Sequence, residues 1–118
     1  MAFQHNNFTA SNLGTHPAAY GRVVSYQWVR EGPYAHFVYD VYHNADAAGG
    51  AGGSPKAQAV ERHDFTVKDT AAIMGPDGTV LVPAITTYTD LFKNSLEPLK
   101  ACYLYLARHP LCSSAIAV

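Results

Sequence analysis

Charged residues are scarce in this sequence of 118 residues, since Asp, Glu, Lys and Arg together make up only 14% of it. Soluble domains usually contain about a quarter of charged residues. The eight basic and nine acidic residues are spread along the chain and leave a net charge of −1. Binding to a phosphate backbone requires a local excess of positive charge, so we expect no nucleic acid among the partners.

Long apolar runs are also missing. No run approaches the roughly 18 residues that a membrane-spanning helix requires. The segment Met1–Leu13 is polar and rich in Asn, and it has no charged start followed by an apolar stretch, as a signal peptide would. We therefore expect no membrane insertion and a chain that is made in the cytoplasm.

Cysteine is limited to Cys102 and Cys112, ten positions apart. A helix after Pro98 would place them about 10 Å or more apart, whereas a disulfide requires Cα atoms within about 7 Å. We expect two reduced, half-buried thiols, although a bridge or metal ligation stays open.

The clearest positive signal lies at residues 20–43. Apolar and aromatic residues alternate along Gly21–Arg30 and along His36–His43, a pattern typical of β-strands. Glu31-Gly32-Pro33 interrupts the pattern, which predicts a hairpin.

The remaining segments are predicted from shorter signals. Asn44–Pro55 is rich in Gly and predicts a flexible loop, whereas Ala57–Lys68 alternates and predicts a third strand at an edge. Gly75–Gly78 predicts a turn, which leads into a short fourth strand at Thr79–Val82. Two helices should follow. The first runs from Thr86 or Thr87 to Asn94, and its buried residues should be Tyr88, Leu91 and Phe92. The second starts at Pro98, and its buried residues should be Leu99, Cys102, Tyr103 and Leu106.

These elements predict an α+β fold with an antiparallel sheet or small sandwich of about four strands and two short C-terminal helices. The length predicts a single domain over residues 1–118. Within it we expect residues 1–19 to form an extended N-terminal arm. Residues 111–118 should form a C-terminal tail that is a docked strand or a segment held by a neighbouring subunit.

The chemistry-bearing residues form no recognised catalytic or metal-binding motif. Six histidines are present without His-x-His or His-Glu-x-x-His spacing, and no Gly-x-Ser-x-Gly segment presents a serine. We expect no enzyme, no cofactor and no metal. An enzyme that uses His43, Asp46 or His63 is the least favoured alternative.

Three segments resemble small structural proteins encoded by tailed bacteriophages. They are His16–Val23, the strand end Val41-Tyr42-His43-Asn44-Ala45, and Pro98-Leu99-Lys100-Ala101-Cys102-Tyr103-Leu104-Tyr105-Leu106. The resemblance implies a virion subunit of the tail, a tail-fibre attachment or the head-to-tail region. The Gly-rich insertion at Ala48–Gly53 departs from the compact turn expected there.

Low charge and eight tyrosines agree with a subunit that contacts other chains, because Tyr is enriched and Lys and Glu are depleted at interfaces. We expect a non-enzymatic structural subunit that forms a homo-oligomer and binds other virion proteins. It should be located in the host cytoplasm before assembly and in the virion afterwards. The candidate interface residues are Phe3, Phe8, Tyr20, Tyr34, Tyr39, Tyr42 and Ile116. The alternative is a soluble module that binds a small ligand or glycan with the Tyr-rich hairpin.

Overall fold

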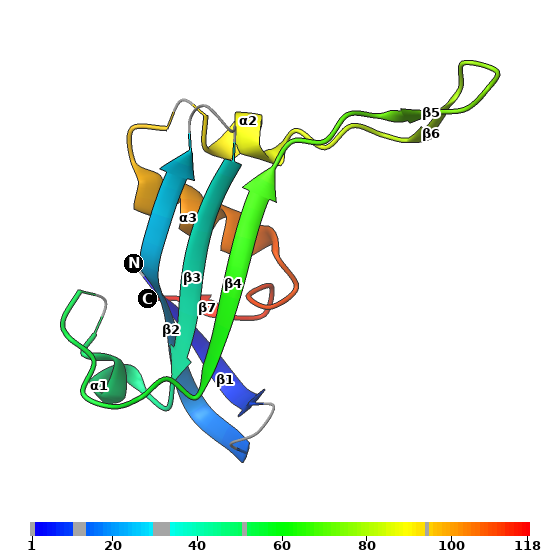
Figure 1. Cartoon of the computed structure of the whole chain (residues 1–118). Helices are drawn as coiled ribbons and strands as arrows, with labels where there is room; N and C mark the ends of the chain where they lie inside the picture. Colours follow the sequence, from blue (N-terminus) through cyan, green and yellow to red (C-terminus); the bar gives the residue numbers. More distant parts are fainter. Residues whose placement is uncertain (1, 11–13, 30–33, 51, 94) are drawn as a thin grey trace.

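The computed structural model describes residues 2–10, 14–29, 34–50, 52–93 and 95–118. Its elements, in chain order, are β1 (Phe3–Ala10), β2 (Gly14–Val29), β3 (Tyr34–Tyr42), α1 (Ala45–Ala48), β4 (Glu61–Lys68), β5 (Ile73–Met74), β6 (Val80–Val82), α2 (Thr87–Leu91), α3 (Pro98–Arg108) and β7 (Ile116–Ala117). The predicted α+β class is confirmed (Figure 1).

The main sheet has five strands in the order β4-β3-β2-β1-β7, and each neighbouring pair is antiparallel. The predicted hairpin of residues 20–43 corresponds to β2 and β3, and its predicted turn at residues 31–33 lies outside the described residues. The predicted third strand is β4, which is an edge strand as expected. The strands β5 and β6 form a separate two-stranded sheet.

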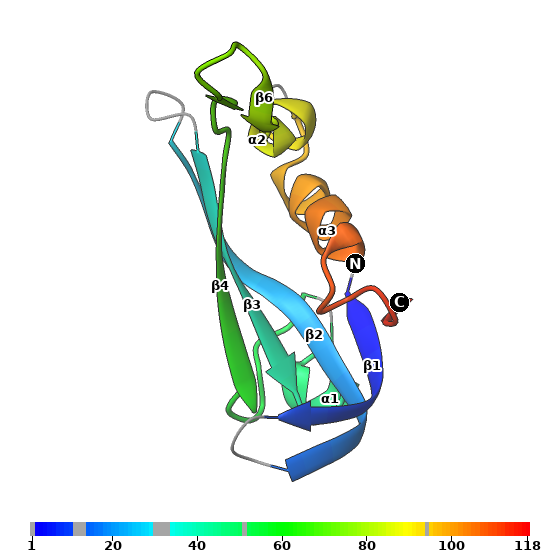
Figure 2. The same ribbon diagram turned by 90° about the vertical axis from the view of Figure 1, so that its right-hand side faces the viewer.

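The core lies between the sheet and the C-terminal helices, which Figure 2 shows on one side of the sheet. Alternate residues of β3, including Phe37, Tyr39 and Val41, point into this core and are fully buried. From α3, Cys102, Tyr103 and Leu106 pack against them as predicted, whereas Leu99 is exposed. The other residues of the core cluster are Phe3, Ala19, Val23, Ala35, Phe65, Val67, Tyr88, Phe92, Ala101 and Cys112.

The prediction of an extended N-terminal arm at residues 1–19 is wrong. β1 and the start of β2 pair with each other from Phe3↔Gly21 to Ala10↔Gly14. Phe3 is buried against Tyr103, with ring centroids 5.7 Å apart. The described part of this segment is therefore built into the sheet, where Phe3 and Ala19 belong to the core under α3 and Ala2 packs with Tyr20 and Tyr42 on the other side.

The C-terminal tail is a docked strand within its own chain, one of the two predicted outcomes. Ile116 and Ala117 pair with β1, and the backbones of Ala2 and Val118 exchange two hydrogen bonds of 3.2 and 3.0 Å. The two ends of the described chain consequently lie side by side (Figure 1).

The flexible loop predicted at residues 44–55 contains the helical turn α1. The Asn44 side chain accepts a hydrogen bond from the Ala47 N–H at 2.8 Å and so caps this turn. The Arg22 side chain donates to three loop carbonyls, those of Ala48, Gly50 and Gly53, at 2.6 to 3.1 Å. The described part of this loop is thus held by the sheet, because an arginine of β2 supplies the donors for its carbonyls.

The first predicted C-terminal helix is short. It ends at Leu91, and its predicted end at Asn94 lies outside the described residues. Thr86 precedes the helix but makes no side-chain capping bond, because its hydroxyl donates to the Asp90 carboxylate instead. Tyr88 and Phe92 are buried as predicted, which fixes α2 over one end of the sheet.

Candidate interaction surface

Most of the candidate interface residues are not available to a partner. Phe3, Tyr20, Tyr39 and Tyr42 are buried, Phe8 and Tyr34 are half-buried, and Ile116 is 51% exposed with its backbone paired to β1. The buried four are wrong as interface residues. α3 covers Phe3 and Tyr39, whereas the α1 loop packs on the opposite side of the sheet against Tyr20 and Tyr42.

The structure places exposed apolar surface elsewhere, on the hairpin of β5 and β6. We call residues 70–85 the arm. The arm projects away from the sheet beyond the end of β4, and the molecule measures 55 Å along its longest axis (Figure 1). The predicted turn at Gly75–Gly78 closes its tip, with a Gly78 N–H to Gly75 carbonyl hydrogen bond of 3.1 Å and a positive φ of 83° at Gly78.

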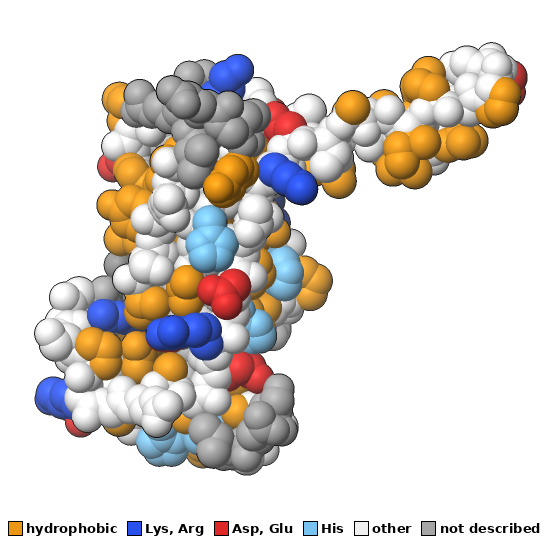
Figure 3. All heavy atoms as spheres, viewed as in Figure 1, with side chains coloured by type: hydrophobic (Ala, Val, Ile, Leu, Met, Phe, Trp, Pro, Cys, Tyr) orange, Lys and Arg blue, Asp and Glu red, His pale blue; other side chains and the backbone are white. Residues whose placement is uncertain are grey.

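The arm carries apolar side chains that no described residue covers. Their exposed fractions run from 46% to 64%, and they are Ile73, Met74, Val80, Leu81, Val82 and Ile85. Figure 3 shows hydrophobic side chains over much of its length. An isolated two-stranded hairpin is marginally stable in water, and a projecting apolar one is typical of a segment that binds a partner.

Local contacts hold the arm at both ends. At the tip, the Thr79 hydroxyl donates to the Asp77 carboxylate at 2.7 Å, which lowers the pKa of Asp77. At the base, the backbones of Thr70 and Ile85 exchange hydrogen bonds of 2.9 and 3.0 Å. The Thr89 hydroxyl of α2 donates to the Asp69 carboxylate and lowers its pKa. The arm is therefore a formed hairpin with its own turn and a tied base.

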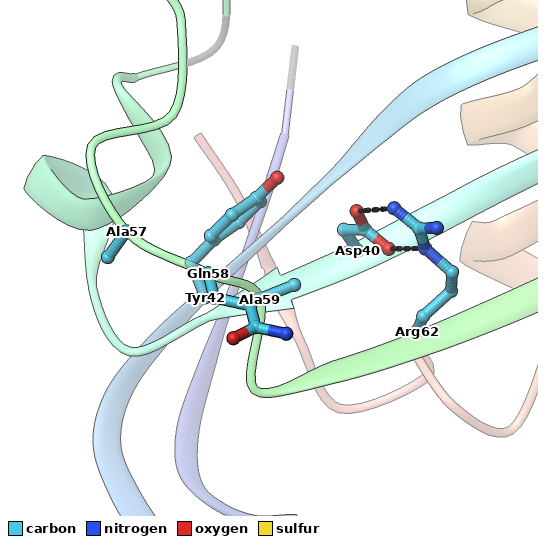
Figure 4. Close-up of a pocket in the computed structure, with 6 residues that line it drawn as sticks. All are labelled: Asp40, Tyr42, Ala57, Gln58, Ala59 and Arg62. Atoms are coloured by element: carbon cyan, nitrogen blue, oxygen red, sulfur yellow. Dashed lines mark hydrogen bonds and ion pairs between the residues drawn. The ribbon is translucent and has the colours of Figure 1, made fainter.

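A polar pocket lies on the other side of the sheet from α3. It has a volume of about 420 Å³ and is lined by Asp40, Tyr42, Ala57, Gln58, Ala59 and Arg62. Asp40 on β3 faces Arg62 on β4, and two hydrogen bonds of 2.8 and 2.9 Å join the carboxylate to the guanidinium (Figure 4). The Asp40 side chain is 3% exposed and that of Arg62 is 63% exposed.

The charges of this pocket are matched within the chain. The hydrogen bonds and charge of Asp40 raise the pKa of Arg62, and burial together with the Asp40 charge raises the pKa of Tyr42. The Arg62 guanidinium therefore stays charged and the Tyr42 phenol stays protonated near neutral pH. Such a pocket can bind a small polar molecule, but it presents no unpaired acid or base of the kind that proton transfer requires.

The histidines pair with single partners in different places. His16 Nδ1 lies 2.8 Å from His43 Nδ1, and His5 Nε2 lies 2.6 Å from the Tyr39 hydroxyl. His63 contacts Glu61 at 2.9 Å and not His43 or Asp46. Among the described residues, no group of three or more His, Cys, Asp or Glu side chains lies close enough to hold a metal ion.

The two cysteines are unbridged and more deeply buried than predicted, since both lie in the core. Burial raises the pKa of the Cys102 thiol to about 12 and that of Cys112 to about 11. Thiols with such values are poor nucleophiles at neutral pH.

Comparisons with protein families, with curated proteins and with solved structures find no match to this chain. Among the described helices, none is both long and apolar enough to cross a membrane. The sequence analysis predicts a strand at Thr79–Val82 but no partner strand at Ile73-Met74, so it does not predict the arm. The signal was present, since Ile73-Met74 and Val80-Leu81-Val82 flank a Gly-Pro-Asp-Gly turn, as in a short hairpin.

Proposed function

We propose that this protein is a non-enzymatic structural subunit that assembles with further copies of itself through the arm. The observation that carries the proposal is the exposed apolar surface of β5 and β6, which projects from the sheet and is covered by no described residue. The resemblance of three segments to structural proteins of tailed bacteriophages favours a virion as the assembly, in the tail, at a tail-fibre attachment or in the head-to-tail region.

The free energy of docking has a clear source. Complete burial of a Val, Leu or Ile side chain contributes about 1.5–3 kcal/mol, and the arm presents several of them. Its formed turn and tied base reduce the conformational entropy that docking would cost. The arm therefore has the composition and the order of a preformed docking element.

The test is one charge placed on the arm. Leu81→Glu should leave the chain folded, because Leu81 is the most exposed of the large apolar side chains of the arm, and should weaken self-association by roughly tenfold or more. Leu104→Glu is the matched control, since Leu104 is an exposed leucine of α3 outside the arm. Sedimentation velocity of the two variants and of the unaltered protein measures the outcome. An assembly that tolerates Leu81→Glu as well as Leu104→Glu would overturn the proposal.

The virion assignment has its own test. The assignment requires that a tailed phage encodes the chain and that mass spectrometry of its purified virions detects peptides of the chain at a fixed copy number. Their absence from the particle would overturn that assignment while leaving assembly through the arm in place.

A second candidate function is binding of a small polar ligand or glycan in the pocket beside Asp40 and Arg62. The volume of about 420 Å³ and the partly exposed Arg62 guanidinium favour this pocket as the ligand site. The hairpin tyrosines Tyr39 and Tyr42 are less suitable as the binding surface, because they are buried. Titration calorimetry against a panel of glycans would show heat that Gln58→Ala removes. Lack of binding across the panel would count against this alternative.

A further inference from the structure

One half of β2 has an edge that no described strand covers. β1 pairs with β2 only as far as Gly21, whereas β3 pairs with β2 to Val29. On the open side, the Val23 N–H donates to the Tyr103 hydroxyl of α3 at 2.9 Å. Beyond this bond, residues 24–29 present a strand edge. A free edge of this kind is a template for pairing with another strand.

The open edge lacks the protection that other edges have. Proteins block free edges with charged side chains, and β4, the outer strand at the opposite side of the sheet, carries Glu61, Arg62, Asp64 and Lys68. The β2 segment Val23-Val24-Ser25-Tyr26-Gln27-Trp28-Val29 has no charged residue. The difference favours pairing at β2 and disfavours it at β4.

A mostly apolar groove, which also holds the ion pair of Glu97 and Lys100, runs beside the open edge. It has a volume of about 310 Å³ and is lined by Tyr26, Glu97, Pro98, Leu99, Lys100 and Tyr103. Tyr26 is 51% and Leu99 41% exposed, so large apolar side chains of both β2 and α3 face the groove without full cover. A strand added to β2 here could place side chains against them.

We propose that the arm of a second copy of this chain adds as a strand to the open edge of β2 and places its apolar side chains in the Tyr26–Leu99 groove. This inference rests on the proposed function and identifies the surface that receives the arm. The dimensions agree, since residues 24–29 offer about 20 Å of edge at 3.3 Å per residue and the four residues Thr79–Val82 need about 13 Å. Strand addition of this type supplies main-chain hydrogen bonds, and the groove supplies specificity.

The arm that binds in the groove must belong to another molecule, because each arm leaves its own sheet on the side away from the open edge of β2. It follows β4, and β3 lies between β4 and β2. The arm extends away from the sheet on the β4 side, so it does not approach the open edge of its own chain (Figure 1). Arm and edge are different surfaces, and their contact is head-to-tail. Such contacts build rings or helical filaments.

Complementation of two defective variants tests the geometry. Leu81→Glu damages the arm and leaves the edge intact, whereas Tyr26→Glu puts a charge beside the edge and leaves the arm intact. Each variant alone should lose self-association by roughly tenfold or more. Their equimolar mixture should form a complex of one copy of each that does not grow further, since only one intact arm and one intact edge remain. Leu104→Glu should assemble like the unaltered protein.

The outcomes separate this inference from the proposed function. If Tyr26→Glu alone assembles normally while Leu81→Glu does not, the arm binds elsewhere, so the inference fails and the proposed function stands. If the unaltered protein stays a monomer, both fail.

A cross-link covers the case in which Tyr26→Glu does not fold. A Leu81→Cys chain mixed with a Tyr26→Cys chain should form a disulfide-linked pair under mild oxidation, because the proposed contact brings the two positions together. The native cysteines are buried and should not compete for this disulfide. A cross-link between two Leu81→Cys chains in place of the mixed pair would overturn the inference.

Discussion

At the residue level, the centre of the core depends on Gly21 having no side chain. A Cβ atom at Gly21 would lie 1.8 Å from the hydroxyl oxygen of Tyr39 on the neighbouring strand. Tyr39 is fully buried, and its hydroxyl is 2.6 Å from His5 Nε2. The tyrosine therefore has no open space into which it could move, and the glycine lets the His5–Tyr39 pair form.

Gly21→Ala should reduce the free energy of unfolding by about 1–3 kcal/mol, the usual cost of overfilling a packed core. Gly52→Ala is the control, since nothing lies within 4 Å of a Cβ built at Gly52. Urea denaturation measures both. Equal stabilities for the two variants would contradict the packing described for Tyr39.

The buried His5 should make stability depend on pH. Burial, together with the nearby His63, lowers the pKa of His5 from its ordinary value of 6.5. The unfolded chain then binds more protons than the folded chain between the lowered pKa and 6.5. The contribution of neutral His5 is complete above pH 6.5 and is lost as the pH falls toward the folded-state pKa.

Urea denaturation at pH 7.5 and pH 5.5 should therefore show a loss of stability at the lower pH, and His5→Gln should show a smaller loss. The difference between the two proteins isolates His5 from the other histidines. An identical pH dependence in His5→Gln would contradict a buried, neutral His5.

The two cysteines should react slowly with a thiol reagent in the folded protein. Burial and pKa values of about 12 for Cys102 and about 11 for Cys112 leave little thiolate at neutral pH. Two thiols should become reactive together in 6 M guanidinium, roughly the concentration that unfolds even very stable domains. Rapid labelling of either thiol without denaturant would show that the core is more open than the structure has it.

At the level of elements, strands with strong alternation could be predicted from the sequence. In β3, large buried residues alternate with less buried ones, so the period of two that marks a strand can be read from the sequence. In β4, Phe65 and Val67 are the buried residues that make the same period recognisable. The β1 strand could not be predicted, because its buried positions include His5 and Ala10 and its exposed positions are Asn6, Asn7 and Thr9, which gives little contrast in hydropathy. Such a strand is specified by its partner, β2, and not by its own pattern.

The helical turn α1 and the interface residues show a second limit. Asn44 followed by Ala45-Asp46-Ala47-Ala48 is a readable N-cap signal, but the Gly residues after it favoured a loop. The predicted interface residues are large apolar side chains of the predicted hairpin and of the two terminal segments. Alternation shows which residues share a face, but not whether a helix or a loop covers that face, and α3 and the α1 loop cover the two faces in question.

Because β1 belongs to the sheet, deletion of residues 1–10 should unfold the chain and not merely prevent assembly. It removes the strand between β2 and β7 and the partner of the Tyr39 hydroxyl. Near-ultraviolet circular dichroism should lose its signal and the cooperative thermal transition should disappear. A truncated chain that melts at the original temperature would contradict the place of β1 in the sheet.

At the level of the whole molecule, the surfaces differ in how they are protected from other chains. The β4 edge is charged, β7 is a strand of two residues, and the polar pocket has its ion pair satisfied within the chain. The arm and the open edge of β2 are uncharged except for Asp77 at the arm tip. Uncharged surfaces of this kind, at opposite sides of one sheet, are what a repeating head-to-tail contact requires.

The mass of the unaltered protein in solution, measured by light scattering across a range of concentrations, tests the central claim most directly. The account predicts masses that are multiples of the single chain and that grow with concentration or settle at a closed ring. A mass that stays at that of one chain at every concentration would contradict assembly of this protein with itself through the arm.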